Sequence, residues 1–369
     1  MYLESLTASP IRKLIFDHYK KIGDSEPQRG YLGASEIGCS CERFLWYRFR
    51  QACTPNIDGR TYRLFDTGNH EEARFVKDLR DIGVTVHDVD SNGNQFEVEE
   101  FGGHFSGHMD SALLGVPEAP KTWHVGEFKT HNTKSFAKLI KGGKIDGIDT
   151  PGVAGAKPQH YAQMQTYMGI SGMTRALYLA KNKDNDDLYA ERVRFDRLYF
   201  QSLMERAKRV IFNTEPPERI ATREDFFECQ WCDAHAICWG TPDLPAFPVP
   251  AVSCRQCCHA TPTLDGNAHW VCSKFNRGLS PQDQDRACDD HLCLPGMFAD
   301  AIPIDYTENH ITYQNPDGQL WSQGNQDGCF KTKELLKLVK SCIGGDLIQL
   351  AKEKFGAVVT DVSPDNTPF

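Results

Sequence analysis

Residues 107–129 read GHMDSALLGVPEAPKTWHVGEFK, and the rest of the chain can be interpreted from this stretch. Its apolar and polar residues alternate with a period of two, which is typical of antiparallel β-strands. Alternate residues of a strand share a face, so Glu127 and Lys129 project together while Phe128 points into the opposite layer. If the strand that carries Asp110 is the hairpin partner of the strand that carries Glu127, the Asp110 carboxylate lies beside Glu127.

These three polar residues suit metal-assisted hydrolysis of a phosphodiester. Asp110 and Glu127 offer two hard oxygen ligands with an open position, which Mg²⁺ and Mn²⁺ prefer. Lys129 would hold and polarise the attacking water, and the metal would offset charge that grows on the phosphate. The alternative is a surface salt bridge on a strand, because a D…ExK pattern is common.

A third carboxylate is predicted on a helix over residues 68–79. Glu72, Val76 and Leu79 follow the i, i+4, i+7 spacing of its apolar stripe. A buried carboxylate has to be paired, neutral or bound to a metal. We therefore expect Glu72 to be the third ligand, and we expect His70 to face the other way.

A helix that opens at Pro158 carries further polar candidates. Gln159, Gln163 and Tyr167 share one stripe of it at i, i+4 and i+8. These amide and phenol groups could hold a nucleic-acid strand or support the metal ligands. The alternative is an ordinary solvated helix face.

The composition indicates a folded protein of two or three units. The chain has 369 residues, 40% of them hydrophobic, and a formal net charge of −9. It has no apolar stretch long enough for a membrane helix, so we expect a soluble, cytoplasmic protein. Strands and helices alternate over residues 1–245, which predicts an α/β domain with a central mixed sheet flanked by helices and a mobile loop over residues 141–157. A proline-rich linker would separate this domain from a zinc-binding module at residues 246–300 and a small α/β tail at residues 301–369.

The 14 cysteines fall in groups, which indicates metal binding in a chain without secretion signals. Cys229, Cys232 and Cys238 form C-x2-C-x5-C, and a tetrahedral site needs a fourth ligand. We expect Cys41 to supply it, with Cys39 in reserve. Four thiolates fit either Zn²⁺ or a [4Fe-4S] cluster, and the spacing does not choose between them.

A second group of cysteines predicts a zinc site in a segment too short and polar to build its own core. His291 is an alternative ligand, while Cys258, His259 and Cys293 are surplus groups or further alternatives. The competing interpretation is a set of reduced, buried thiols. The predicted zinc ligands are Cys254, Cys257, Cys272 and Cys288.

Two stretches of the acidic chain carry net positive charge. Residues 129–157 contain six lysines and two aspartates, a balance of 6 − 2 = +4. Residues 41–63 contain five arginines and two carboxylates, a balance of 5 − 2 = +3. Both flank the carboxylates in sequence, as expected for a channel that binds a polyanion, although charge runs are often only solvated surface.

Taken in order, these motifs resemble the PD-(D/E)XK nuclease superfamily over about residues 30–240. Within it they are most similar to the RecB-like iron-sulfur branch, which includes helicase-nuclease exonuclease domains, CRISPR adaptation nucleases and phage exonucleases, and above all to phage-encoded members. Many relatives have histidine where Glu72 stands. The motifs are Ser35-x2-Gly38, Cys41-x-Arg43, Trp46-Tyr47, Gly68-x3-Glu72, Gly107-x2-Asp110, Glu127-x-Lys129, Gln163-x3-Tyr167 and the C-x2-C-x5-C run.

The resemblance implies an arrangement of the catalytic and iron-sulfur residues. Asp110, Glu127 and the Phe128 carbonyl would bind Mg²⁺ or Mn²⁺, and Lys129 would position the water. The Q-x3-Y motif would complete the catalytic site. The expected [4Fe-4S] ligands are Cys41, Cys229, Cys232 and Cys238.

The expected function is that of a metal-dependent DNA exonuclease in recombination, repair or phage replication. Its substrate would be DNA, and a single-strand annealing protein or a helicase would be its protein partner. It would act in the cytoplasm of a bacterial or phage-infected cell. One rival is a non-catalytic iron-sulfur and zinc adaptor that binds DNA on a nuclease scaffold. A redox enzyme built on the C-x2-C pairs is another, but it leaves the carboxylates unexplained.

Overall fold

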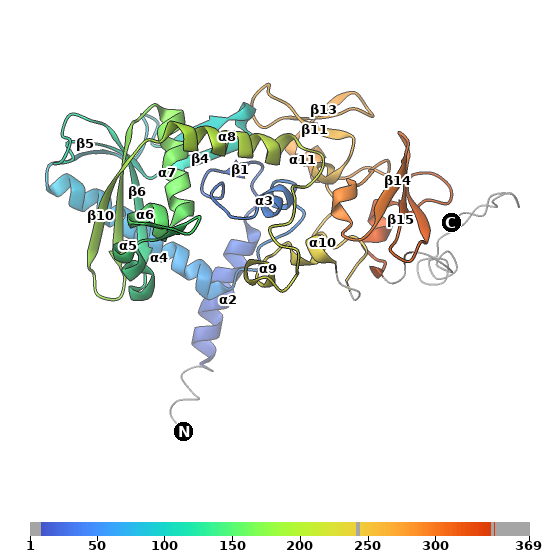
Figure 1. Ribbon diagram of the computed structural model, residues 1–369, viewed down its shortest axis with the longest axis horizontal. Coiled ribbons are helices and arrows are strands. Elements are labelled where there is room, and N and C mark those ends of the chain that lie inside the picture. The colour runs from blue at the N-terminus through green and yellow to red at the C-terminus, as the bar shows by residue number, and fades with distance from the viewer. Residues whose placement is uncertain (1–8, 241–243, 341–342, 344–369) are drawn as a thin grey trace, which may run out of the picture. The chain divides into compact units, whose positions relative to one another are not determined.

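A computed structural model describes residues 9–240, 244–340 and 343 of the chain (Figure 1). The chain divides into two compact units. The first unit comprises Met1–Cys39 and Asn56–Ala207, and the second comprises Ser40–Pro55 and Lys208–Phe369. Within the described residues, no helix is both long and apolar enough to cross a membrane.

A mixed five-stranded sheet organises the first unit. Its strand order is β10-β9-β6-β5-β2, in which β6 and β9 are parallel and the other pairs are antiparallel. The expected α/β class with a central mixed sheet is therefore confirmed. The strands are β2 (Thr85–His87), β5 (Ser111–Leu114), β6 (His124–His131), β9 (Arg175–Asn182) and β10 (Leu188–Arg194).

A second, three-stranded sheet of the first unit has the order β1-β4-β3. It consists of β1 (Leu32–Gly33), β3 (Phe96–Glu100) and β4 (Phe105–Met109). Asp110 is the single residue between β4 and β5, so the chain passes from one sheet to the other at this position. Because Ser111 pairs with Gly126, Asp110 lies close to the middle of β6.

Helices cover both faces of the five-stranded sheet. Helix α4 (Gly59–Asp81) packs its buried Phe75, Val76 and Leu79 on one face, where the rings of Phe75 and Phe128 are 5.3 Å apart. Helix α7 (Pro158–Ser171) contacts β6 and β9. Since α4 packs on Phe128, the alternation of β6 turns Glu127 toward the opposite face, where α7 lies.

The segment predicted as a mobile loop, residues 141–157, is ordered instead. It contains a hairpin of β7 (Gly143–Ile145) and β8 (Ile148–Thr150), followed by α6 (Gly152–Ala156). The turn between the strands is Asp146-Gly147, with both residues at positive φ, 51° and 80°. An Asp-Gly turn between two isoleucines is a hairpin signal that the abundance of glycine and lysine obscured.

The described residues of the first unit form three further helices. Helix α2 (Pro10–Ser25) packs against α4, and α5 (Thr133–Lys141) follows β6. Helix α8 (Arg197–Phe212) begins in the first unit and ends in the second. Turn η1 (Phe101–Gly103) joins β3 to β4.

The second unit combines short elements from both sides of Asn56–Ala207 in the sequence. Helix α3 (Glu42–Phe49) begins after Cys41, whose Sγ caps it by accepting a hydrogen bond of 3.4 Å from the Phe44 amide. Two three-stranded sheets follow. The other elements are α9 (Phe227–Gln230), α10 (His235–Trp239), η2 (Cys254–Gln256), β11 (Ala260–Pro262), β12 (Trp270–Cys272), β13 (Arg277–Leu279), α11 (Pro281–Gln284), η3 (Pro295–Met297), β14 (Ile302–Tyr306), β15 (His310–Gln314), β16 (Leu320–Gly324) and α12 (Thr332–Leu335).

One hydrophobic core runs through the described part of the second unit. It joins Trp46 and Tyr47 of α3 to Leu292 in the predicted zinc-binding segment and to Tyr313 and Trp321 in the predicted tail. The zinc-binding segment therefore shares a core with its neighbours and does not depend on a metal alone. The predicted boundaries after residues 245 and 300 stay predictions, and the tail beyond Ile343 lies outside the described residues.

Candidate functional site

The backbone of β6 fixes the Asp110 carboxylate. Asp110 Oδ2 accepts a hydrogen bond of 2.7 Å from the Phe128 amide. This contact follows from the pairing of β5 with β6, because Asp110 directly precedes β5. The expected juxtaposition of Asp110 with the Glu127-Phe128-Lys129 segment is thus present in the structure.

The Lys129 ammonium lies where the predicted metal ligands converge. Its Nζ is 2.5 Å from Glu127 Oε1 and 3.8 Å from Asp110 Oδ2, and it donates a hydrogen bond of 3.1 Å to the Phe128 carbonyl. The Lys129 ammonium therefore lies among the oxygen atoms that the sequence predicted to bind Mg²⁺ or Mn²⁺. The arrangement provides a hard, oxygen-rich environment of the kind that Mg²⁺ and Mn²⁺ prefer.

Glu127 is the most constrained group of this site. Its side chain is 0% exposed, and neither carboxylate oxygen accepts a hydrogen bond of acceptable geometry from a described residue, although Lys129 forms the close ion pair. Burial, opposed by Lys129 and reinforced by Asp110, raises the pKa of Glu127 to about 8. Burial alone would lower the pKa of Lys129, but Glu127 and Asp110 outweigh it and raise that pKa. A buried carboxylate without hydrogen bonds is costly unless a cation compensates it.

Glu72 adds negative charge from helix α4. It is half-buried, and burial followed by the charge of Asp110 raises its pKa to about 7, against the effect of Lys129. His70 is 80% exposed and lies 3.7 Å from Asp66, so it points away from the site, as predicted. One lysine is therefore shared among three acidic groups, which favours uptake of a further cation.

The protein groups alone do not form a closed metal cage. Over the described ranges, no set of three or more His, Cys, Asp or Glu side chains is arranged to hold a metal ion. The donor types nevertheless fit a divalent ion, because the Glu127 oxygens accept no hydrogen bond from a described residue, and Asp110 and the Phe128 carbonyl lie around the same ammonium that pairs with Glu127. Metal binding at this site stays a prediction.

Gln163 and Tyr167 form the wall beside the carboxylates. Gln163 Nε2 donates to the Tyr167 hydroxyl at 3.1 Å, and both side chains are buried, so α7 does not present them on a solvated face. Burial and the charge of Glu127 raise the pKa of Tyr167. A Cβ on Gly107 would lie 2.9 Å from the Tyr167 ring and 2.7 Å from Ala34 Cβ, so only glycine fits between them.

The sequence did not single out a histidine–tyrosine cluster next to this wall. Tyr178 of β9 is aligned with Glu127, and its hydroxyl lies 2.9 Å from His131 Nε2 and 2.8 Å from His160 Nδ1. The period-two pattern that places Glu127 and Lys129 on one face extends to His131, which was the available signal. The cluster links β6, β9 and α7 beside Lys129.

Four cysteines of the second unit line a small cavity of about 20 Å³. Arg43 and Arg219 also line it, and burial followed by the neighbouring thiols raises the pKa of Cys232 to about 11. Cys39 belongs to the first unit. Thiols and arginines are the side-chain types that suit an anionic metal–thiolate centre, but no three of these thiols are placed to hold a metal ion in the described residues, and the centre stays a prediction. The four are Cys41, Cys229, Cys232 and Cys238.

Cys254 lies near the other predicted zinc ligands, because it interacts electrostatically with Cys288, Cys272 and Cys257. Burial followed by the proximity of Cys288 and Cys272 raises the pKa of Cys254 to about 11. Cys257 lies opposite Cys293 in an isolated antiparallel bridge. His291 is already occupied, because its ring nitrogens lie 3.0 Å from Thr332 Oγ1 and 2.9 Å from the Ser253 carbonyl. The thiols are therefore better zinc candidates than the alternative ligand His291.

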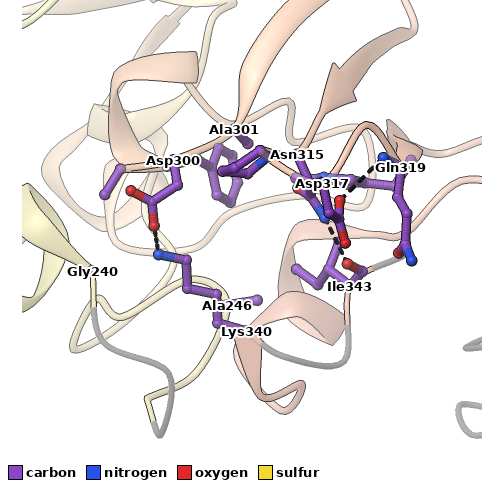
Figure 2. Close-up of a pocket in the computed structure, with 13 residues that line it drawn as sticks. Gly240, Ala246, Asp300, Ala301, Asn315, Asp317, Gln319, Lys340 and Ile343 are labelled. Atoms are coloured by element: carbon purple, nitrogen blue, oxygen red, sulfur yellow. Dashed lines mark hydrogen bonds and ion pairs between the residues drawn. The ribbon is translucent and has the colours of Figure 1, made fainter. Parts of the chain in front are cut away.

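A larger cavity of about 500 Å³ lies elsewhere in the second unit (Figure 2). Phe298, Trp321 and Ile343 contribute apolar surface, and Lys340 forms an ion pair with Asp300. None of the predicted catalytic residues lines it. The cavity is therefore separate from the predicted catalytic residues.

Comparisons with known proteins give distant likenesses only. No family model matches the chain, and no curated protein matches it. An alkaline exonuclease, LHK-Exo from Laribacter hongkongensis, is 18% identical with a TM-score of 0.35, over 50% of this chain and 87% of that one. Its complex with dAMP is also 18% identical with a TM-score of 0.35, over 49% and 86% of the two chains. The structure of SSO0001 is 13% identical with a TM-score of 0.36, over 62% and 95%. Likenesses at this level assign neither a family nor an activity.

Proposed function

We propose that the chain is a Mg²⁺- or Mn²⁺-dependent deoxyribonuclease that hydrolyses phosphodiester bonds, most simply as an exonuclease acting on DNA ends. The observation that supports it is the convergence of Asp110, the buried Glu127 and the Phe128 carbonyl on the ammonium of Lys129. A salt bridge with a purely structural role would be expected at the surface, where the carboxylate remains hydrated.

In this mechanism Asp110, Glu127 and the Phe128 carbonyl would hold the metal, and Glu72 would be a further ligand. When bound, the divalent ion would lower the pKa of water and offset charge on the phosphate. Lys129 would orient the attacking water through its ammonium hydrogens. Hydrolysis by water needs no covalent enzyme intermediate.

Gln163 and Tyr167 would position the substrate strand against this site. Their mutual hydrogen bond fixes the amide and the phenol, and the raised pKa of Tyr167 keeps the phenol neutral, so that it can donate to a phosphate oxygen. Exposed lysines on α5 and β7 follow β6 directly in the chain and provide a surface for a polyanion. Arg50 was counted with the positive residues, but it is only 1% exposed and does not contribute to such a surface. The lysines are Lys134, Lys138, Lys141 and Lys144.

We further propose that the four-thiol cavity of the second unit holds a [4Fe-4S] cluster. Arg43 and Arg219 line the same cavity, and their charges would offset the negative charge of a thiolate-bound cluster. A zinc ion at Cys254, Cys257, Cys272 and Cys288 is proposed on the donor types. A single-strand annealing protein or a helicase as partner, and a phage origin, stay predictions.

The test is digestion of end-labelled linear DNA and closed circular DNA with Mg²⁺, Mn²⁺ or EDTA. We expect metal-dependent loss of the linear substrate, and complete loss of activity in Lys129→Met and Asp110→Asn with the fold retained. Lys121→Met is the matched control, because Lys121 is an exposed lysine of the same unit outside the site. Cleavage of closed circles would contradict the exonuclease mode. DNA binding without cleavage by the wild-type chain would favour the adaptor.

A further inference from the structure

Two buried cysteines of the second unit face each other directly. Cys257 and Cys293 form an isolated antiparallel bridge. The amides that follow Cys257 and Cys293 donate backbone hydrogen bonds of 2.7 and 2.8 Å to the carbonyls that precede the opposite cysteine. Cys257 and Cys293 are therefore a non-hydrogen-bonded antiparallel pair. In such a pair the Cα atoms are about 4.5 Å apart, and the side chains lie closer together than in a hydrogen-bonded pair.

This spacing suits a disulfide bond, whose Cα atoms are usually about 4.4–6.8 Å apart. Both residues are well buried, with 6% of Cys257 and 0% of Cys293 exposed, and the structure has neither in a disulfide. Cys258 is the nearest competitor, because it lies in the turn that the hydrogen bond of 3.1 Å from the Ala260 amide to the Cys257 carbonyl closes, and its thiol also acts on Cys293. The isolated bridge nevertheless pairs Cys293 with Cys257 and not with Cys258. Cys258 Sγ donates to the Cys293 carbonyl at 3.5 Å, so it contacts the backbone of Cys293.

We propose that Cys257 and Cys293 are a modification site that forms a reversible disulfide on exposure to a peroxide. The Cys257 thiol, the more exposed of the two, would attack hydrogen peroxide, giving a sulfenic acid and one water. The Cys293 thiol would then attack the Cys257 sulfur, forming the S–S bond and releasing a second water. Overall, two thiols are oxidised, one peroxide is reduced and two waters form.

The disulfide would exclude Cys257 from metal binding, because a zinc ligand has to be a thiolate. The oxidised segment would lose the C-x2-C pair that Cys254 and Cys257 form, so oxidation and zinc binding compete for the same sulfur. This competition depends on the zinc site proposed above, whereas the disulfide itself does not. Neither depends on nuclease activity.

The linked segment also supports helix α3. Gln256 Nε2 donates to the Arg50 and Gln51 carbonyls at 3.3 and 3.1 Å, and Arg255 Nη1 donates to the Phe49 carbonyl at 3.1 Å. Because these contacts precede Cys257 directly, a link to Cys293 would restrain the residues that hold the end of α3. Because both thiols are buried, we expect oxidation to be slow compared with that of exposed cysteines.

The test uses the full chain as purified, treated with hydrogen peroxide over a time course. Unreacted thiols are blocked with N-ethylmaleimide, and the digest is analysed without reductant by mass spectrometry with fragment ions. We expect a peptide pair joined through Cys257 and Cys293 that dithiothreitol separates. Cys257→Ser and Cys293→Ser should abolish it, while the matched control Cys258→Ser should retain it.

Two results would overturn the disulfide. One is a link from Cys293 to Cys258, or from Cys257 to Cys254, in place of the proposed pair. The other is recovery of both cysteines as maleimide adducts after exposed thiols such as Cys288 have been oxidised. Zinc released by peroxide is measured with a colorimetric chelator, and full linkage with zinc retained would refute the competition.

Discussion

Replacement of Gly107 and of Gly68 by alanine should change the stability of the first unit in opposite directions. A Cβ at Gly107 would lie 2.7 Å from Ala34 Cβ and 2.9 Å from the Tyr167 ring, and the Ala34 atom is attached directly to the backbone. At Gly68, inside α4, the Cβ would have no described atom within 4 Å. Gly107→Ala therefore forces displacement of β4, of Ala34 or of Tyr167. Gly68→Ala meets no such contact and stabilises the fold by lowering the backbone conformational entropy of the unfolded chain.

Overpacking of this kind costs about 1–3 kcal/mol, and alanine in a helix interior gains about 0.5–1 kcal/mol over glycine. For a unit of this size, 1 kcal/mol shifts the melting temperature by about 2–4 °C. We expect Gly107→Ala to melt about 2–12 °C below the wild type and Gly68→Ala about 1–4 °C above it, by circular dichroism. A displaced Tyr167 should also lower the kcat of the proposed nuclease reaction by about 10²-fold. Equal melting temperatures for Gly107→Ala and the wild type would refute the steric argument.

Three further predictions concern buried polar groups and the thiol cavity. Tyr178→Phe leaves the facing nitrogens of His131 and His160 without their partner and should lower the urea unfolding free energy by about 2 kcal/mol or more, and an unchanged value would contradict the cluster. Burial, followed by the charge of Lys129, lowers the pKa of His160 to about 3, below its unfolded value, so its stabilising effect is present above about pH 6.5 and is lost as pH falls toward 3. The free energy of unfolding of the wild type should therefore fall by about 2 kcal/mol more between pH 7 and pH 5 than that of His160→Asn. Urea unfolding curves of both proteins at the two pH values measure this difference. Cys238→Ser should remove the brown visible absorption of an iron-sulfur centre, and a colourless wild type with bound zinc would refute that centre.

Local patterns predicted the centre of the first unit well. The period of two in residues 107–129 places Glu127 and Lys129 on one face, and the pairing of β5 with β6 brings Asp110 to the Phe128 amide. These relations depend on neighbours in sequence and on a short antiparallel pairing. For this reason the sequence alone could indicate them.

Relations that depend on distant partners were harder to predict. The sequence left open whether Gln163 supports a functional site or lies on a solvated face; it is buried in a helix packed on β6 and β9, where its amide donates to the Tyr167 hydroxyl. Tyr178 had no signal of its own, because its two histidines come from β6 and α7. The same holds for α3, whose Trp46 packs in the core of the second unit with residues more than 200 positions later.

The division of the second unit has a consequence for the order of synthesis. Ser40–Pro55 leaves the ribosome before the whole of Asn56–Ala207, but its core partners between residues 246 and 343 come last. The first unit can fold during translation, while Trp46, Tyr47 and Phe49 wait as exposed apolar surface that is prone to aggregate or to bind chaperones. A gene fragment that stops at residue 245 would keep Ala234 and Ile237 but lack the other later core partners of Trp46 and Tyr47, which lie between residues 246 and 343. Soluble expression of the residues that we propose to be catalytic should therefore require residues that the proposed mechanism does not use.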